Sequence, residues 1–315
     1  MKRISVVTPV FMEEEGVSKF YSEVVLNLES LKVDFEVIFC IDPSTDNTEL
    51  VIEEMCKKDK RAKMIVFSKR VGQDFALMAG LEIAIGDCVV LMDSDLQDPP
   101  SLLPKLIETW LAGHKVVLAQ RKSRDGENLI KIWTSKFFYR FMRKFSDENF
   151  PEGTGDFRLL DRSVVNEVIK FKEQQPFMRA VMSLVGFEST RIEFERESRA
   201  IGVTKYSRFF GGYQIAFRTI LNYSNILLKL SLIIGITIAV SSFLFAIFFV
   251  VAKIFGAEFA SGVTTIVFSI WFLGGTILTG IGIVGLYIDK IFNEVKVKPR
   301  YIVARSLGLS HNKEL

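Results

Sequence analysis

The first 120 residues alternate short apolar, β-branched runs with longer segments in which apolar positions recur at helical spacing. This pattern predicts strands at residues 4–10, 35–41, 63–67, 88–92 and 115–119, and helices at 17–31, 48–58, 75–85 and 102–111. Alternation of this kind is typical of βαβ units around a mainly parallel sheet. Ligands bind such sheets beyond the carboxyl ends of the strands, so the residues that follow the strands are expected to converge on one crevice. The strand ends concerned are Val10, Ile41, Met92 and Ala119.

From residue 226 onward the chain becomes almost wholly apolar. Residues 226–251 contain one charged side chain, Lys229, and residues 263–288 contain none. Each stretch exceeds the roughly 20 residues that a helix needs to cross a hydrocarbon core about 30 Å thick. The pattern predicts a two-helix transmembrane hairpin. A buried hairpin of a soluble protein is the alternative, although core helices are rarely apolar on all sides over such a length.

Charges around the predicted hairpin indicate its orientation. The connector at 252–262 has only Lys253 and Glu258, whereas the flank of the second span carries Lys290, Lys296, Lys298, Arg300 and Arg305. Positive residues accumulate on the cytoplasmic side, so both termini and the large domain are expected in the cytoplasm, at the inner (cytoplasmic) membrane. Small residues on the second span permit close helix packing, which favours a homo-oligomer. They are Gly274, Gly275, Gly280, Gly282 and Gly285.

Two further stretches, 129–145 and 206–223, mix aromatic residues with Lys and Arg at helical spacing. This mixture is typical of amphipathic helices that lie in the plane of the lipid headgroups. For the first stretch, an amphipathic helix packed on the sheet is the alternative. The second leads directly into the first predicted span, which favours the interfacial interpretation.

Composition narrows the chemistry. Hydrophobic residues make up 49% of the chain, and a net charge of +3 gives no indication of a nucleic-acid partner. The three cysteines are widely spaced and fit neither a disulfide framework nor a zinc site, so a reduced cytosolic domain is expected. The chain contains two histidines, which disfavours a Ser-His-Asp triad, and any metal is expected to be held by carboxylates. The amino terminus lacks the long apolar region of a signal peptide.

The strongest single motif is MDSDLQDPP at residues 92–100. Asp93, Ser94 and Asp95 follow a buried strand, and two prolines then end it. Two carboxylates at a strand end can share one hard divalent cation, Mg²⁺ or Mn²⁺, and leave its other positions to water and a diphosphate. A solvated loop is the alternative interpretation of the triplet alone.

Further motifs extend along the chain: VVTPVFMEEEGV at 6–17, IDPSTDNT at 41–48, VGQDFALMAGL at 71–81, GDFRLLDR at 155–162 and RAIGVTKY at 199–206. With these, the chain resembles family-2 glycosyltransferases of the GT-A type. Within them it resembles the polyprenyl-phosphate branch, which includes the bactoprenol glucosyltransferases and dolichyl-phosphate mannosyltransferase. The resemblance runs nearly end to end and implies a Rossmann-like GT-A domain.

The resemblance also implies roles for particular residues. Nucleotide and donor contacts fall to Pro9, Phe11, Glu13, Asp42, Gln73, Asp93, Ser94, Asp95 and Arg121. Asp93 and Asp95 are the implied metal ligands, and Asp95 and Asp156 the implied catalytic residues. The implied acceptor-phosphate contacts are Arg158, Arg199, Lys205 and Tyr206. Arg158 could instead form a structural ion pair with Asp156 or Asp161, and Lys205 and Tyr206 could be membrane anchors.

The chain departs from the family pattern at three positions near the implied nucleotide pocket. Met12 stands where Asn is common, and Ile41 and Pro43 replace a polar residue and Gly. Pro43 fixes φ near about −65°, where glycine is unrestrained. Donor-base selectivity is therefore the implied property that these changes affect most.

Charge development during the reaction suggests the mechanism. Departure of a nucleotide diphosphate leaves negative charge that a divalent cation stabilises. A phosphate monoester acceptor, with a second pKa of about 6, is already a dianion for the most part near neutral pH. We therefore expect Asp156 to orient the acceptor rather than act as an obligatory base, while Arg158, Arg199 and Lys205 position the phosphate. A single displacement predicts inversion at the anomeric carbon.

The expected function is transfer of a hexose, glucose from UDP-glucose first, to undecaprenyl or another polyisoprenyl phosphate. Mannosyl or N-acetylhexosaminyl transfer stays open. A processive polysaccharide synthase is disfavoured because no Gln-x-x-Arg-Trp motif occurs, and an inactive membrane scaffold is the alternative from another class. The expected divisions are a glycosyltransferase domain at 1–206, an interfacial segment at 207–225, two transmembrane helices within 226–288 and a basic tail at 289–315.

Overall fold

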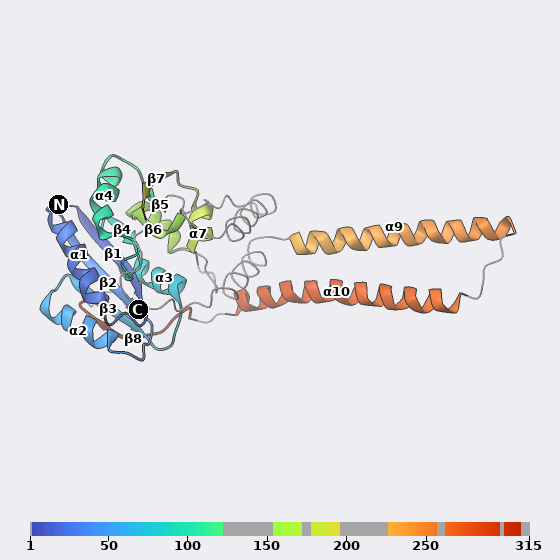
Figure 1. The fold of residues 1–315 in the computed structure, drawn as a ribbon, viewed down its shortest axis with the longest axis horizontal. Helices are drawn as coiled ribbons and strands as arrows, with labels where there is room; N and C mark the ends of the chain where they lie inside the picture. The colour runs from blue at the N-terminus through green and yellow to red at the C-terminus, as the bar shows by residue number, and fades with distance from the viewer. Residues whose placement is uncertain are drawn as a thin grey trace. The chain divides into compact units, whose positions relative to one another are not determined.

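The structure, a computed structural model, describes residues 2–121, 154–171, 178–195, 226–256, 262–296 and 299–309. The chain divides into two compact units. The first comprises Met1–Tyr139, Glu148–Ser207 and Lys298–Leu315, and the second comprises Arg140–Asp147 and Arg208–Val297. The described residues of the first unit form an α/β domain, and those of the second form two long helices (Figure 1).

The described strands of the first unit form one sheet in the order β7-β5-β6-β4-β1-β2-β3-β8. Their bounds are Arg3–Val10 (β1), Asp34–Ile41 (β2), Ala62–Phe67 (β3), Cys88–Leu91 (β4), Val116–Arg121 (β5), Thr154–Asp161 (β6), Ser189–Phe194 (β7) and Val303–Leu307 (β8). Strand β1 pairs in parallel with β2 and β4, as do β2 with β3 and β5 with β7. Antiparallel pairs join β6 to β4 and β5, and β8 to β3. The predicted mainly parallel sheet is confirmed.

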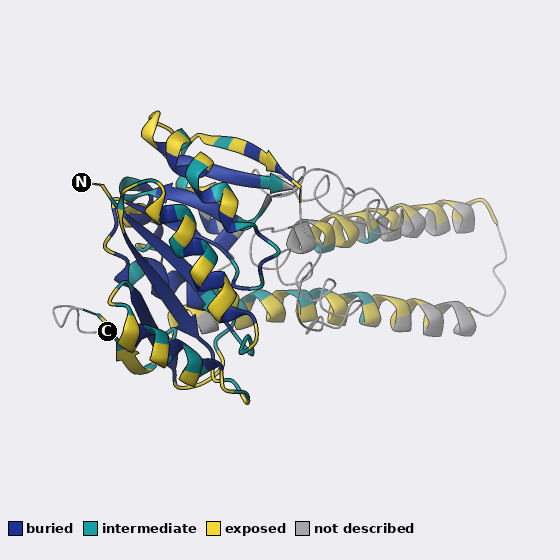
Figure 2. Ribbon diagram, turned by 60° about the vertical axis from the view of Figure 1, so that its left-hand side comes forward, coloured by how far each residue is buried: buried dark blue, intermediate teal, exposed yellow. Residues whose placement is uncertain are grey.

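Helices cover both faces of this sheet. They are α1 (Val17–Glu29), α2 (Thr48–Lys58), α3 (Gln73–Ile83), α4 (Leu103–Leu111, after a 3-10 turn at Pro100–Leu102), α6 (Arg162–Val168) and α7 (Met178–Val185). The βαβ alternation predicted for the first 120 residues is confirmed, with α3 beginning two residues before its predicted start. Figure 2 shows the buried strands between partly exposed helices.

Two apolar cores lie on the two faces of the sheet. One contains Phe20 and Leu28 of α1, and the other contains Leu77 and Leu81 of α3. The packing of α3 is especially close at Gly80, where an added Cβ would lie 2.2 Å from Val7 Cγ1 and 2.9 Å from Cys40 Sγ. Only a residue without a side chain allows this approach, so α3 lies directly on β1 and β2.

A buried polar group, here called the amino-end cluster (Ser5, Glu36 and Lys63), lies near the beginnings of β1, β2 and β3. The Ser5 hydroxyl donates to Glu36 Oε1 at 2.6 Å, and Lys63 Nζ lies 2.5 Å from Glu36 Oε2. The Ile85 N–H donates to Glu36 Oε1 at 2.9 Å. Glu36 is 1% exposed, so these partners replace the water that its carboxylate loses on burial.

Strand β8 belongs to the C-terminal strap, which we define as residues 299–309. It forms an edge of the sheet against β3, with Met64 opposite Leu307 and Val66 opposite Arg305. Arg305 also pairs with Glu53 and Glu49 of α2. A basic tail was predicted at 289–315. The strand within it was not predicted because its partner, β3, lies more than 200 residues earlier in the chain.

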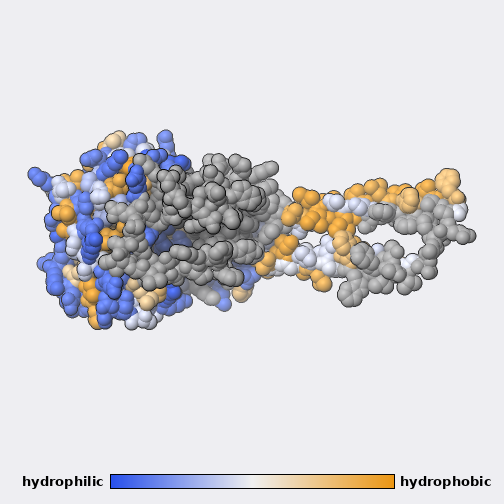
Figure 3. Space-filling model, viewed as in Figure 1, coloured by the Kyte–Doolittle hydropathy of each residue, from blue (hydrophilic) through white to orange (hydrophobic). Residues whose placement is uncertain are grey.

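The second unit contains α9 (Ile226–Ile254) and α10 (Val263–Val295). Large apolar side chains on both are exposed, among them Phe248 on α9 and Leu278 on α10 (Figure 3). Within the described residues, one segment, Phe272–Phe292 of α10, is long and apolar enough to cross a bilayer. The helical character expected at 226–251 and 263–288 is confirmed, whereas the transmembrane hairpin stays a prediction. Both predicted interfacial stretches lie outside the described residues.

Candidate active site

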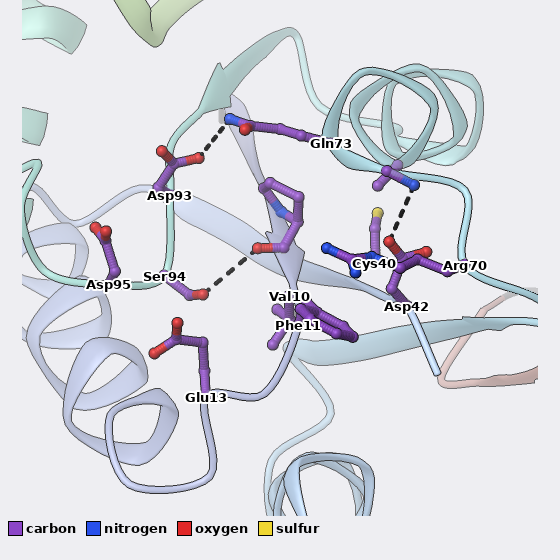
Figure 4. A pocket seen from close by; sticks show the side chains of 13 residues that line it. Val10, Phe11, Glu13, Cys40, Asp42, Arg70, Gln73, Asp93, Ser94 and Asp95 are labelled. Carbon is purple, nitrogen blue, oxygen red and sulfur yellow. Dashed lines mark hydrogen bonds between the residues drawn. The ribbon is translucent and has the colours of Figure 1, made fainter. Parts of the chain in front are cut away.

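A pocket lies at the carboxyl ends of β1, β2 and β4, where the sequence placed its crevice. Its lining comprises Pro9, Val10, Phe11, Glu13, Cys40, Asp42, Arg70, Gly72, Gln73, Ala76, Asp93, Ser94 and Asp95 (Figure 4). Residues distant in the chain meet there because parallel strands end at the same edge of the sheet. The convergence expected after Val10, Ile41 and Met92 is confirmed. Gln120, the one residue after Ala119 on β5 whose side chain the structure describes, is not among the lining residues.

One side of the pocket is acidic. Asp93, Ser94 and Asp95 follow β4, and Figure 4 shows Glu13 on the same side. The Ser94 hydroxyl lies 3.4 Å from the carbonyl oxygen of Pro9, which ties the loop after β4 to β1. The Gln97 N–H donates to Asp95 Oδ1 at 3.1 Å and fixes the turn. These two hydrogen bonds hold the loop that carries the predicted carboxylates at the pocket rim.

The opposite side combines an aromatic ring with a cation. The guanidinium carbon of Arg70 lies 4.0 Å from the centroid of the Phe11 ring, a cation–π arrangement. Arg70 follows β3, which ends at Phe67, and was not among the predicted site residues. Its position beyond a parallel strand was the available signal, but it lies just before the VGQDFALMAGL motif at 71–81 and outside it.

Asp42 follows β2 and is 5% exposed. Its Oδ1 accepts from the Val71 N–H at 2.8 Å, and its Oδ2 accepts from the Gly72 N–H at 3.0 Å. The carboxylate therefore holds the loop that begins α3. Each oxygen has a second lone pair, so a contact with base or ribose stays a prediction beside this structural role.

Gln73 joins two of the predicted carboxylates. Its side-chain Nε2 donates to Asp93 Oδ1 at 2.9 Å and to Asp156 Oδ2 at 3.2 Å. Asp156 lies on β6, and its side chain is 17% exposed. A single amide group thus brings a predicted metal ligand and the predicted acceptor-orienting residue to the same place, although 63 residues separate them in the chain.

Arg158 is almost fully buried, with its side chain 2% exposed. Its Nη2 donates to the Gly155 carbonyl at 2.7 Å and lies 3.5 Å from Asp156 Oδ1. These contacts match the structural ion pair that the sequence left open, so a contact with the acceptor phosphate stays a prediction.

At the pocket floor, burial and then the charge of Asp42 raise the pKa of the Cys40 thiol, which is therefore a poor nucleophile.

Met12, the first departure from the family pattern, has φ of 55°. Its backbone N–H donates to Ser44 Oγ at 3.0 Å, which holds the turn after β1 in this conformation. Left-handed backbone disfavours methionine and is tolerated by asparagine, the residue common in relatives. Leu96, beside the acidic side of the pocket, also has a positive φ of 58°.

The remaining predicted residues lie at or beyond the limits of the described chain. Arg121 ends β5, but its side chain is outside the described part. Arg199, Lys205 and Tyr206 lie outside the described residues. Their predicted contact with the acceptor phosphate stays a prediction.

The acidic side of the pocket suits a divalent cation that shares its ligands with a substrate. Within the described residues, no three acidic, histidine or cysteine side chains form a ready metal site. Asp93 and Asp95 supply hard oxygen ligands, and a diphosphate and water would complete a cation's coordination. The donor set therefore fits Mg²⁺ or Mn²⁺ bound together with a nucleotide.

The mainly parallel α/β sheet, with an Asp-x-Asp triplet after β4 beside an aromatic pocket, is the arrangement expected of a glycosyltransferase of the GT-A class. The model of the glycosyl transferase family 2 matches residues 5–169, and the chain belongs to this family.

Two relatives match nearly the whole chain. The uncharacterized glycosyltransferase YkcC of Bacillus subtilis is 35% identical over 98% of this chain and 95% of its own. The bactoprenol glucosyl transferase of Shigella phage SfII is 36% identical over 96% of this chain and 98% of its own. Among solved structures, the glucosyl-3-phosphoglycerate synthase of Mycobacterium tuberculosis with Mn²⁺, UDP and phosphoglyceric acid has 18% identity and a TM-score of 0.49. That similarity covers 70% of this chain and 76% of the synthase.

Proposed function

We propose that this enzyme transfers glucose from UDP-glucose to undecaprenyl phosphate, or another polyisoprenyl phosphate, with inversion at the anomeric carbon. The product is a lipid-phosphate-sugar that serves as donor for modification of the cell envelope or O-antigen. Relatives named bactoprenol glucosyl transferase cover 96% of the chain at 36% identity, and this observation supports the acceptor and the sugar.

The shape of the pocket supports a nucleotide diphosphate donor. Phe11, Arg70 and Asp42 form an aromatic and polar end for the nucleoside, and Asp93 and Asp95 form an anionic end (Figure 4). Two carboxylates alone would repel a diphosphate, so Asp93 and Asp95 would hold a divalent cation, which would supply positive charge for the leaving group. Pro9, Glu13 and Ser94 complete the donor contacts in this proposal.

Asp156 acts in the proposed reaction by orienting the acceptor. Its carboxylate is held at the pocket by Gln73 and lies 3.5 Å from the Arg158 guanidinium. The acceptor phosphate already carries the attacking oxygen as an anion and needs no base. The proposed acceptor contacts are Arg158, Arg199, Lys205 and Tyr206, whereas Arg121 and Gln73 belong to the proposed donor contacts.

We also propose the expected division of the chain, with two spans and a cytoplasmic catalytic domain. Strand β8 supports this topology because the chain leaves the first unit before α9 and rejoins its sheet after α10. An even number of bilayer crossings in the intervening segment would return the chain to the side on which it left. The low charge of α9 and α10, with the cations of 290–305 after them, favours two crossings and a cytoplasmic return.

A donor panel with purified enzyme tests the proposal. With undecaprenyl phosphate fixed, we expect label from UDP-glucose to enter the lipid, and label from UDP-galactose, UDP-N-acetylglucosamine or GDP-mannose to enter far less. EDTA should stop transfer, and Mg²⁺ or Mn²⁺ should restore it, which also ranks the two metals. Preference for another donor would overturn the sugar assignment, products with several sugars would favour a polysaccharide synthase, and absence of donor binding would favour a scaffold.

The glycines of α10 support a proposed homo-oligomer, because they remove side chains from one helix surface. Around Gly274, Gly282 and Gly285, which share one face of the helix, an added Cβ would meet nothing within 4 Å. Light scattering of the purified protein in detergent should give a mass above that of one chain plus its micelle. A single-chain mass would reject this part of the proposal.

A further inference from the structure

Helix α3 connects the donor pocket with the C-terminal strap. At its first residue, Gln73 donates to Asp93 and Asp156. At its last residue but one, Glu82 binds the strap through both carboxylate oxygens. Arg300 Nη2 lies 2.6 Å from Glu82 Oε1, and the Tyr301 hydroxyl donates to Glu82 Oε2. One short helix therefore carries pocket contacts at one end and strap contacts at the other.

Arg300 also reaches a second part of the domain. Its Nη1 donates to the Phe171 carbonyl oxygen at 2.9 Å. Phe171 follows α6, and α6 directly follows β6, the strand that carries Asp156. The planar guanidinium thus ties the end of α3 to the chain that leaves the Asp156 strand, a geometry that a lysine cannot reproduce.

Tyr301 is anchored on the strap side. Its ring packs edge-on against Phe67 of β3, with centroids 5.6 Å apart. Burial, and then the hydrogen bond to Glu82, raises the pKa of Tyr301, so its hydroxyl stays protonated and donates at neutral pH. The Ser68 N–H donates to the Ile302 carbonyl at 2.9 Å and fixes the next residue of the strap.

The body of α3 is packed tightly enough to move as one piece. Its backbone at Gly80 contacts Val7 and Cys40 without space for a methyl group. Asp74, beside Gln73, accepts from the Met178 N–H at 3.1 Å and so holds the start of α7. Close-packed interiors transmit displacements instead of absorbing them, so a shift at Glu82 reaches Gln73.

We propose that Glu82, Arg300 and Tyr301 are positioning residues, through which the C-terminal strap sets the placement of Gln73 between Asp93 and Asp156. The strap directly follows α10 in the chain, so the alignment of the active site depends on the segment that leaves the membrane helix. The kinetic part of this inference rests on the proposed glycosyl transfer, whereas the structural part does not.

Arg300→Ala and Arg305→Ala form a matched pair that tests the inference in the full-length protein. Both remove a strap arginine that pairs with a helix, but Arg305 contacts α2 through Glu49 and Glu53. We expect Arg300→Ala to lower kcat about tenfold, with less than a twofold change in the donor KM. Arg305→Ala should leave kcat within twofold of the parent. Arg300→Lys, which keeps the charge, should be intermediate.

Hydrogen exchange supplies a readout that needs no substrate. In Arg300→Ala, we expect faster exchange in a peptide covering residues 71–76 at the far end of α3, as well as near Glu82. Arg305→Ala should leave that peptide unchanged. Tyr301→Phe, which keeps the ring against Phe67, should give the same pattern more weakly and serves if Arg300→Ala does not fold.

The outcomes separate the two hypotheses. If the parent protein transfers no sugar to polyprenyl phosphate but Arg300→Ala still loosens 71–76, the proposed function fails and the positioning role stands. If the parent is active and both Arg300→Ala and Tyr301→Phe leave kcat and the exchange of 71–76 unchanged, the positioning role is wrong. Equal losses of kcat in Arg300→Ala and Arg305→Ala would also reject it, because the strap would then act only through general stability.

Discussion

At the beginnings of β1, β2 and β3, the carboxylate of Glu36 is buried and bonded to Ser5 and Lys63, whereas beyond β4 Asp93 and Asp95 line a pocket. The two ends of the sheet therefore use the same chemical groups differently. At the amino end, each Glu36 oxygen meets a protein donor and the pair is closed to solvent. At the carboxyl end, the carboxylates stay accessible to a ligand.

The backbone conformation also differs between the two ends of the sheet. Of the three described non-glycine residues with positive φ, Met12 and Leu96 lie beside the pocket, and Lys32 lies in the turn after α1. Strain of this kind collects where a loop must present groups to a ligand. The comparison teaches that changes at the amino end should reduce stability, whereas changes at the carboxyl end should reduce catalysis with little loss of stability.

The largest expected effect is at the acidic side of the pocket. Asp95→Ala should lower transfer by about 1,000-fold or more, equivalent to roughly 4 kcal/mol, because the diphosphate loses its cation. Labelled UDP-glucose with undecaprenyl phosphate measures this, and Asp93→Ala should behave alike. The thermal midpoint should stay close to that of the parent. Asp34→Ala, at an exposed carboxylate paired with Arg3, is the control and should keep full activity. Unchanged transfer in both pocket variants would disprove the metal assignment.

The next largest effect is expected at the opposite end. Glu36→Gln should lower the free energy of unfolding by about 3 kcal/mol, because the Lys63 ammonium stays buried without its counter-charge. Thermal unfolding of the full chain in detergent measures the loss, and kcat of the folded fraction should be unchanged. Glu36→Met combined with Lys63→Met should recover much of the stability, since a buried apolar pair needs no compensation. A double variant no more stable than Glu36→Gln would contradict this account.

A smaller catalytic effect is expected at Gln73, which donates hydrogen bonds to both Asp93 and Asp156. Gln73→Ala should lower kcat roughly 10- to 100-fold, because Asp93 and Asp156 lose their common donor. Gln73→Lys should retain most activity, since an ammonium group can donate to both carboxylates. Gln73→Glu should be worse than Gln73→Ala because it adds a third negative charge. Steady-state kinetics ranks the three, and an active Gln73→Glu enzyme would reject the bridging role.

The smallest effect is expected from the strained turn. Met12→Asn should raise the free energy of unfolding by about 0.5–1 kcal/mol, because asparagine tolerates left-handed backbone better than methionine. Lys32→Asn, at a φ of 52° away from the pocket, is the matched control and should give a similar gain. Thermal midpoints measure both. A gain at Lys32 without one at Met12 would show that contacts of the methionine side chain offset its strain.

The parallel part of the fold could be predicted because its signals are local. The strands from β1 to β4 are short apolar runs separated by helical patterns, and their parallel pairing follows from βαβ geometry. Strand β5 was predicted as a strand, but its pairing with β6 and β7 was not. Strands β6, β7 and β8 could not be placed in this way. β6 inserts between β4 and β5, and β8 pairs with a strand more than 200 residues earlier, so no periodicity within either segment specifies its partner.

The residues of the candidate site likewise divide into those that could be predicted from the sequence and those that could not. Phe11, Asp42 and Asp93 could be expected at one pocket because each follows a parallel strand. The link from Gln73 to Asp156 could not, because it depends on where the antiparallel β6 enters the sheet. Arg70 was missed because a single arginine after a strand has no distinctive spacing. Two roles were predicted for Arg158; its burial and its contact with the Gly155 carbonyl support the structural role, and the acceptor contact stays a prediction.

Strand β8 has a consequence for the order of events during synthesis. Residues 303–307 leave the ribosome after every other strand of the sheet, and after both α9 and α10. Until then β3 presents an open edge, which invites pairing with other chains. A ribosome adds about 5–20 residues per second, so the edge stays open for many seconds while residues 68–302 are made. Protein truncated before Val303 would keep that edge permanently, and aggregation of the nascent enzyme should depend on whether residues 303–307 have been added.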